Sequence, residues 1–200
     1  SVMFVDPSGK GKDQTAISCV KMLNGNLYVT ECLGLSGGYS DAVLEKISKI
    51  ARDNNINQIL VEQNFGGGMF AELLKPFLMR FHPCQVEDVR NNKTKELRII
   101  DTLEPVMNSH RLIIDRKVIE KDFRSNPQET PERRLKLQLV YQLSRISRHK
   151  GSLVHDDLVD SLAGAVAYWT DYMAQNEDLN ISKRKEELLS IHTDNWDSLL

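Results

Sequence analysis

The chain has 200 residues, of which 40% are hydrophobic and 27% are charged, and its formal net charge is −2. This length suits one domain with a sizeable core, and the composition excludes a disordered or fibrous protein. Three cysteines without a Cys-x-x-Cys pair argue against a disulfide framework and a zinc site. The apolar runs are far shorter than a membrane span, so we expect no membrane association.

The first predicted strand ends on an acid. Residues 1–6, "SVMFVD", are apolar up to Asp6, and Pro-Ser-Gly then indicates a turn. The following "GKGKDQT" resembles a nucleotide-binding loop, but a P-loop needs Gly where Asp6 stands and Ser or Thr after Lys12, where the chain has Asp13. We therefore interpret Asp6 as a candidate functional residue, with an Asp that bonds its own turn as the simpler alternative.

Two further strands are predicted over residues 14–23 and 26–35. Asn24 and Gly25 separate these apolar runs, and Asn-Gly is typical of a two-residue hairpin turn. Apolar residues at helical spacing then predict a helix over residues 41–55. The first strand is therefore expected to belong to an antiparallel meander.

The next predicted strand repeats the pattern of the first. Residues 56–62 form a short apolar strand that closes on Glu62, and glycines follow at 66–68. A helix up to residue 81 and a fifth strand over 84–89 complete a β–β–β–α–β–α–β order. This order predicts an α/β fold with a mixed sheet.

The remaining chain is predicted to be mainly helical. One helix is expected over residues 131–148, with Pro131 in its first turn, and another from residue 155 to 173. We expect a domain over residues 1–174 and a polar C-terminal tail over 175–200, which contains a candidate short docking helix.

Basic residues are concentrated in the middle of the chain. Residues 90–150 hold fifteen lysines and arginines against eight aspartates and glutamates. A basic stretch on an acidic chain is a candidate phosphate-binding surface. Solvated helix faces are the alternative explanation.

The last strong helix carries three acids at its start. Asp157, Asp160 and Gly164 lie opposite its apolar face, and Asp156 lies close to its first turn. Helix capping and the helix dipole account for Asp156 and Asp157. They do not account for Asp160, which therefore needs another explanation.

Acids at the ends of strands and at this helix start are expected to converge. The two predicted strands that close on an acid are expected to open onto one crevice of the α/β sheet. Asp6, Glu62 and Asp157 would then form a pocket of carboxylates. Such a pocket requires a cation. Magnesium prefers oxygen ligands, and two such ions about 3.5–4 Å apart can activate water against a phosphodiester.

Three stretches together resemble a known family. Asp6 with "GKGKDQT", Glu62 in "LVEQNFGGG", and "HDDLVDSLAGA" resemble the three acidic motifs of the C-terminal nuclease domain of tailed-phage terminase large subunits. The resemblance implies an RNase H-like α/β fold, with a mixed central sheet of five or more strands and helices on both faces. It also implies a metal-dependent endonuclease that cuts concatemeric viral DNA during genome packaging by two-metal-ion hydrolysis.

The resemblance assigns roles to individual residues. Asp6, Glu62 and Asp157 would be the catalytic metal ligands for Mg²⁺ or Mn²⁺, and two ions are expected. Further candidate ligands are Asp156, Asp160 and Asp13. The basic residues that we expect to contact DNA are Lys10, Lys12, Arg90, Lys93, Lys95, Arg145, Arg148 and Lys150.

The resemblance also implies partners. These are double-stranded DNA, an ATPase motor domain earlier in the same full-length chain, the portal and the small terminase subunit, in the host cytoplasm on the procapsid. No Walker motif occurs in the sequence, so we expect no ATP hydrolysis by this chain. The alternatives are another RNase H-like nuclease of the resolvase or recombinase type, an actin-like or sugar-kinase ATPase, and a docking module without activity that binds DNA or the portal.

Overall fold

The structure, a computed structural model, describes residues 1–8, 14–63, 68–90 and 94–197, with side chains up to residue 177. The chain divides into two compact units, Ser1–Ala167 and Tyr168–Leu200. The division expected at residue 174 stays a prediction. In the described part of the chain, no helix is both long and apolar enough to cross a membrane.

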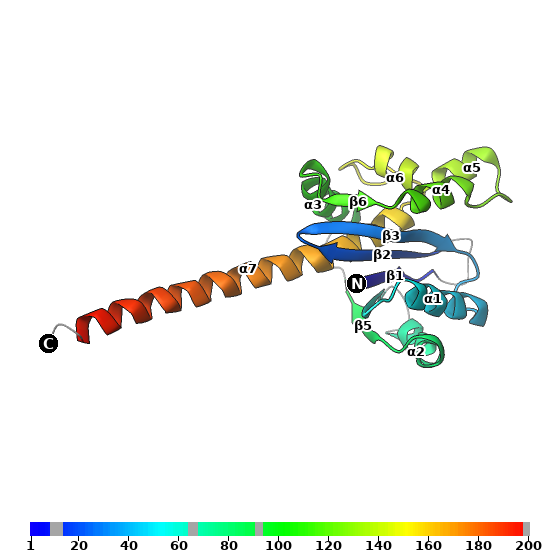
Figure 1. Ribbon diagram of the computed structural model, residues 1–200. Helices are drawn as coiled ribbons and strands as arrows, with labels where there is room; N and C mark the ends of the chain where they lie inside the picture. Colours follow the sequence, from blue (N-terminus) through cyan, green and yellow to red (C-terminus); the bar gives the residue numbers. More distant parts are fainter. Residues whose placement is uncertain (9–13, 64–67, 91–93, 198–200) are drawn as a thin grey trace. The chain divides into compact units, whose positions relative to one another are not determined.

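A mixed six-stranded sheet forms the centre of the first unit (Figure 1). Its strands are β1 (Val2–Asp6), β2 (Thr15–Leu23), β3 (Asn26–Leu35), β4 (Gln58–Glu62), β5 (Gln85–Val89) and β6 (Leu112–Ile114). Their order is β5-β4-β1-β2-β3-β6. Strands β1, β2 and β3 pair antiparallel, whereas β4 pairs parallel with β1, β5 with β4, and β6 with β3. The predicted α/β fold with a mixed sheet is confirmed.

The hairpin between β2 and β3 has the predicted turn. Asn24 and Gly25 have φ angles of 52° and 77°, and Leu23 pairs with Asn26 across the turn. Two successive residues with positive φ define the type I′ turn, whose twist matches that of the strands.

Helices pack on both faces of this sheet. The helices in the described part of the chain are α1 (Asp41–Asp53), α2 (Met69–Phe81), α3 (Lys95–Asn108), α4 (Arg116–Arg124), α5 (Pro131–Lys136), α6 (Leu139–Arg145) and α7 (Asp157–Asp197), of which α7 extends from the first unit into the second. Helices α1 and α2 cover one face, where Met3 and Val5 of β1 pack in one core with Ile47 and Leu74. Alternate residues of a strand point to opposite faces, so Phe4 and Asp6 belong to the other face.

The start of α7 packs on that second face. Gly164 lies against the ring of Phe4, and the hydroxyls of Ser18 and Ser161 are 2.7 Å apart. Leu158 and Leu162 of this helix are also buried. The acid-bearing first turns of α7 are therefore held against β1 and β2.

The region between residues 111 and 148 differs from the sequence prediction. Strand β6 and helix α4 were not predicted, and the single helix expected over 131–148 is wrong, because α5 and α6 are separate. The buried carboxylate of Asp122 accepts hydrogen bonds from the N–H groups of Leu139 (2.8 Å) and Val140 (3.1 Å). This contact satisfies the first free N–H groups of α6, so a new helix begins there.

Candidate metal centre

Three buried acids meet at the carboxyl ends of strands β1 and β4. Asp6, Glu62 and Asp160 each offer a carboxylate oxygen, and these oxygens all lie within 4.8 Å of one another. The three residues are 7%, 8% and 2% exposed, respectively. We call them the acid cluster. It joins the ends of β1 and β4 to the first turn of α7.

The strand register explains why two of these acids are neighbours. Strands β1 and β4 run parallel, with Val5 paired to Val61, so Asp6 and Glu62 follow at the same edge. Val5 and Val61 both lie in the core under α1 and α2. The next residue of each strand faces the opposite side, where Asp160 lies on α7.

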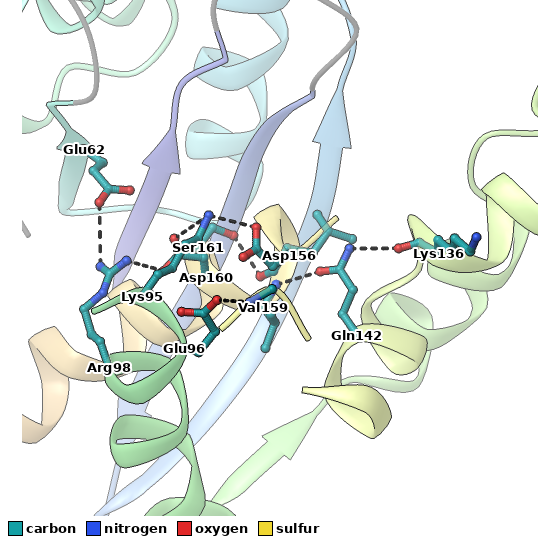
Figure 2. A network of polar contacts seen from close by, with 12 residues as sticks. Glu62, Lys95, Glu96, Arg98, Lys136, Gln142, Asp156, Val159, Asp160 and Ser161 are labelled. Carbon is teal, nitrogen blue, oxygen red and sulfur yellow. Dashed lines mark hydrogen bonds and ion pairs between the residues drawn. The ribbon is translucent and has the colours of Figure 1, made fainter. Parts of the chain in front are cut away.

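Two cations from helix α3 lie against the acid cluster. Arg98 Nη2 is 2.6 Å from Asp160 Oδ1, and Arg98 Nη1 is 3.7 Å from Glu62 Oε1. Lys95 Nζ is 2.9 Å from Asp156 Oδ1 and 3.1 Å from Asp160 Oδ2. Figure 2 shows both side chains directed toward the start of α7. Lys95 and Arg98 therefore offset part of the negative charge of the acid cluster.

Burial and like charges change the ionisation of the acid cluster. Burial, with the charges of Glu62 and Asp160, raises the pKa of Asp6 to about 8. Burial also raises the pKa of Asp160 to about 6, against the opposing effect of Lys95 and Arg98. Burial disfavours the charge on Lys95, but Asp160 and Asp156 outweigh it and raise the pKa of Lys95 above its ordinary value. An added cation would therefore lower the electrostatic free energy of the acid cluster.

Polar contacts hold the start of α7 and the segment before it in place. Gln142 Oε1 accepts a hydrogen bond from the N–H of Val159 (3.1 Å), and Gln142 Nε2 donates to the carbonyl of Lys136 (3.3 Å). On the other side, Glu96 Oε1 accepts from the N–H of Gly151 (2.7 Å), in the segment before α7 (Figure 2 labels Glu96). These contacts connect α7 to α6, and the segment before α7 to α3.

The other acids expected from the sequence lie around the acid cluster. Asp157 is half-buried in the first turn of α7, and its charge contributes to the raised pKa of Asp6. Asp156 pairs with Lys95. Asp13 lies outside the described residues. Asp160 was expected from the sequence only as a further ligand, and the structure places one of its carboxylate oxygens within 4.8 Å of an oxygen of Asp6 and of Glu62.

The basic residues expected to contact DNA have varied surroundings. Lys95 lies against the acid cluster, where it pairs with Asp160 and with the neighbouring Asp156. Arg148 pairs with Asp101 and Glu104 of α3, each at 3.1 Å. Lys150 is exposed. None of these contacts tests whether the residues bind DNA, so the assignment stays a prediction.

Two more of these residues have partners of their own. Arg90 Nε donates to Gln63 Oε1. The guanidinium carbon of Arg145 lies 6.0 Å from the centre of the Tyr141 ring. Lys10, Lys12 and Lys93 lie outside the described residues.

Sequence reasoning missed the roles of Arg98 and Gln142. Lys95 and Arg98 are three residues apart, so they share one side of a helix. A buried group of acids requires nearby cations, and this spacing was the available signal. Gln142 has no such signal, because its function depends on where α6 meets α7.

The family model described as "Terminase Bacteriophage T7, Ribonuclease H-like domain" matches residues 5–112. The large terminase subunit of Enterobacteria phage T3 is 37% identical over 188 residues, which cover 94% of this chain and 31% of that protein. The chain therefore spans about a third of the length of this relative.

Solved structures agree on the fold. The human cytomegalovirus terminase nuclease domain, soaked with Mn and bound to an inhibitor, has a TM-score of 0.56 at 13% identity, covering 83% of this chain and 82% of that one. A mutant nuclease domain of the large terminase subunit gp2 of bacterial virus Sf6, with manganese and beta-thujaplicinol, has a TM-score of 0.51 at 13% identity, covering 82% and 86%.

Proposed function

We propose that this chain, which belongs to the family of the ribonuclease H-like domain of the bacteriophage T7 terminase, is a divalent-metal-dependent DNA endonuclease. Its role would be to cut concatemeric viral DNA during genome packaging. The observation that carries this proposal is the acid cluster, in which three elements far apart in sequence bring three buried carboxylates within 4.8 Å. An arrangement this costly in electrostatic free energy indicates a bound cation.

The donor atoms of the acid cluster fit magnesium or manganese. All three are carboxylate oxygens, which hard divalent ions prefer, and neither histidine nor cysteine belongs to the cluster in the described part of the chain. Asp6, Glu62 and Asp160 would hold the metal, with Asp157, Asp156 and Asp13 as further proposed ligands. Two bound ions would supply an activated water and neutralise charge on the phosphodiester. The cytomegalovirus and Sf6 domains were studied with manganese, which supports extending the proposal to this chain.

The chain's own residues would prepare the site in three ways. Burial of the acid cluster keeps bulk water from competing for the carboxylate oxygens. We propose Asp6, at the end of β1, as the ligand shared by two ions, because one of its carboxylate oxygens lies within 4.8 Å of oxygens of both Glu62 and Asp160. Gln142 and Glu96 accept hydrogen bonds from the backbone at Val159 and Gly151, which both precede Asp160 in the chain, and so would help to hold Asp160 in place.

Double-stranded DNA is the proposed substrate. Arg90, Arg145, Arg148 and Lys150 come from the basic middle of the chain, and Lys10, Lys12, Lys93 and Lys95 are the other proposed contacts. Contacts of this kind neutralise phosphates without reading bases, so we expect little sequence preference and strong salt dependence.

The proposed partners follow from the relative in phage T3. The chain matches 31% of that large terminase subunit, so an ATPase motor domain in the same full-length protein is proposed, together with a portal and a small terminase subunit. The proposed location is the host cytoplasm, where the protein would dock transiently on the procapsid.

A plasmid-cleavage assay with Mg²⁺, Mn²⁺, Ca²⁺ or EDTA tests the proposal. We expect nicking and linearisation in Mg²⁺ or Mn²⁺, none in EDTA, and loss of cleavage in Asp6→Asn and Asp160→Asn. Asp157→Asn in the same assay shows whether this neighbouring acid is also required. Asp41→Asn is the matched control, because Asp41 is an exposed acid of α1 outside the acid cluster.

The opposite outcome is also informative. If the protein binds DNA but leaves it intact in every metal, the nuclease proposal for this chain fails and a docking module becomes the better explanation. If cleavage persists in Asp6→Asn and Asp160→Asn, the reaction occurs elsewhere than at the acid cluster.

A further inference from the structure

Arg98 contacts two acids of the cluster at once. Its guanidinium lies 2.6 Å from Asp160 and 3.7 Å from Glu62, and the Arg98 side chain is only 13% exposed. These acids come from α7 and β4, while Arg98 comes from α3. One buried cation therefore already occupies the space between two proposed metal ligands, as the dashed lines of Figure 2 show.

Both carboxylate oxygens of Asp160 have a cationic partner. Oδ1 pairs with Arg98 and Oδ2 pairs with Lys95 at 3.1 Å. Asp160 is 2% exposed, so water has little access to either oxygen. A metal that binds Asp160 must therefore share or replace one of these ion pairs. The Arg98 pair is shorter and more buried than the Lys95 pair, and it is the stronger competitor.

The position of Arg98 follows from local structure. Arg98 lies one turn after Lys95 on the first turns of α3, and the neighbouring Glu96 ties this end of the helix to Gly151. Further along the same helix, Asp101 pairs with Arg148, and both of these side chains are exposed. The pair between Arg98 and Asp160 is buried, so solvent and salt screen it much less.

We infer that Arg98 competes with the divalent metal for Asp160 and Glu62 and thereby limits the metal affinity of the site. The guanidinium stabilises the acid cluster while the metal is not bound, and its ion pair with Asp160 is weakened or replaced when the metal binds. This inference rests on the proposed function, because it assumes that the acid cluster binds a metal. It adds a role for a residue that is itself not a metal ligand.

Binding of Mn²⁺, followed by the electron paramagnetic resonance signal of the free ion, measures this competition without any cleavage. Titrations under nitrogen at pH 8.5 limit competition from protons on the same carboxylates. We expect Arg98→Met to bind Mn²⁺ at least about tenfold more tightly than the unsubstituted protein, because a strong charge-assisted competitor is removed. Lys95→Met should show a smaller increase, since Lys95 is more exposed.

Arg116→Met is the matched control, because it removes an exposed arginine that pairs with Glu120 of α4, outside the acid cluster. We expect its Mn²⁺ affinity to stay within about twofold of the unsubstituted protein, since exposed ion pairs contribute little. Arg98→Lys keeps one positive charge but loses the forked contact, so its affinity should fall between those of the unsubstituted protein and Arg98→Met. This variant also keeps the test valid if Arg98→Met does not fold.

Thermal unfolding gives an independent measure. In EDTA, Arg98→Met should unfold at a lower temperature, because the acids lose a counter-ion. The rise in unfolding temperature on adding Mn²⁺ should be larger than in the unsubstituted protein.

Unchanged or weaker Mn²⁺ binding in Arg98→Met and Arg98→Lys would overturn the inference. If the unsubstituted protein still binds Mn²⁺ and Asp6→Asn does not, that outcome leaves the proposed function standing. If the unsubstituted protein binds no Mn²⁺ at all, the inference and the proposed function both fail.

Discussion

Gly164 of α7 lies so close to Phe4 of β1 that a Cβ atom at position 164 would be 2.4 Å from Phe4 Cε2. Asp160 precedes Gly164 by one helical turn, so the same contact places the Asp160 carboxylate beside the end of β1. Close packing without a side chain at this point therefore sets the position of a proposed metal ligand.

Gly164→Ala should lower the free energy of unfolding by about 1–3 kcal/mol, because the added methyl group forces the helix or the ring to move. Mn²⁺ affinity should also fall, since Asp160 moves with the helix. Chemical denaturation and Mn²⁺ titration measure the two effects. Phe4→Leu in the same chain makes room for the methyl group, so the double variant should lose less stability than the two single losses added together. Strict additivity would contradict this explanation.

Replacement of Asp6 should raise the stability of the metal-free protein while abolishing DNA cleavage. Asp6 is buried beside two other acids, so the folded metal-free protein must keep this carboxyl protonated at neutral pH, and Asp6→Asn removes that free-energy cost. We expect the free energy of unfolding in EDTA at neutral pH to rise by about 1–3 kcal/mol, with cleavage lost. Differential scanning calorimetry in EDTA measures the change. A less stable Asp6→Asn protein would show that the Asp6 carboxylate stabilises the fold by itself.

Stability of the metal-free protein should increase as the pH falls from 8 to 6. The pKa of Asp6 is raised from 3.8 to about 8 on folding, so below pH 8 the folded state holds a proton that the unfolded state lacks. This contribution is complete below the unfolded pKa and is lost as the pH rises through about 8. We expect a gain of about 2 kcal/mol between pH 8 and pH 6.

Urea unfolding in EDTA at pH 6, 7 and 8 measures this dependence. Asp6→Asn should flatten the curve over the same range, because the titrating group is absent. The raised pKa of Asp160, about 6, adds a further gain below that pH. Stability that falls from pH 8 to pH 6 would contradict the raised pKa of Asp6.

Gln142 is expected to stabilise the start of α7. It is 1% exposed, and Gln142→Met keeps most of its volume while removing the acceptor for the Val159 N–H. A buried donor without a partner costs about 1–3 kcal/mol, so the unfolding temperature should fall and the Val159 amide should exchange faster with deuterium. Ser144→Ala, on the exposed side of the same helix, serves as the control. Unchanged exchange at Val159 would show that this contact is not needed.

Salt dependence of DNA binding can test the basic residues one at a time. Measured in EDTA, Lys150→Gln should weaken binding, and the slope of log affinity against log salt should fall by about 0.9 if Lys150 neutralises one phosphate. Arg148→Gln should have a smaller effect, because Asp101 and Glu104 already pair with Arg148. Equal slopes in both variants and the unsubstituted protein would show that neither residue neutralises a DNA phosphate.

The sequence predicted the local features well. Apolar strands that close on Asp6 and Glu62 are visible as short runs, and Asn24-Gly25 is enough to specify the hairpin turn. These features depend on residues next to one another in the chain. The break between α5 and α6 depends instead on Asp122, a distant residue, and the prediction of one helix there was wrong.

The sequence by itself determined that acids end two strands and begin one helix of an α/β fold. Only the tertiary structure decided that Asp160 meets Asp6 and Glu62, and that Arg98 lies between two of them. The period of a strand or helix fixes which side of its own element a residue faces. Distances between α3, β4 and α7 depend on how the whole core packs, and the pKa shifts of the acid cluster depend on those distances.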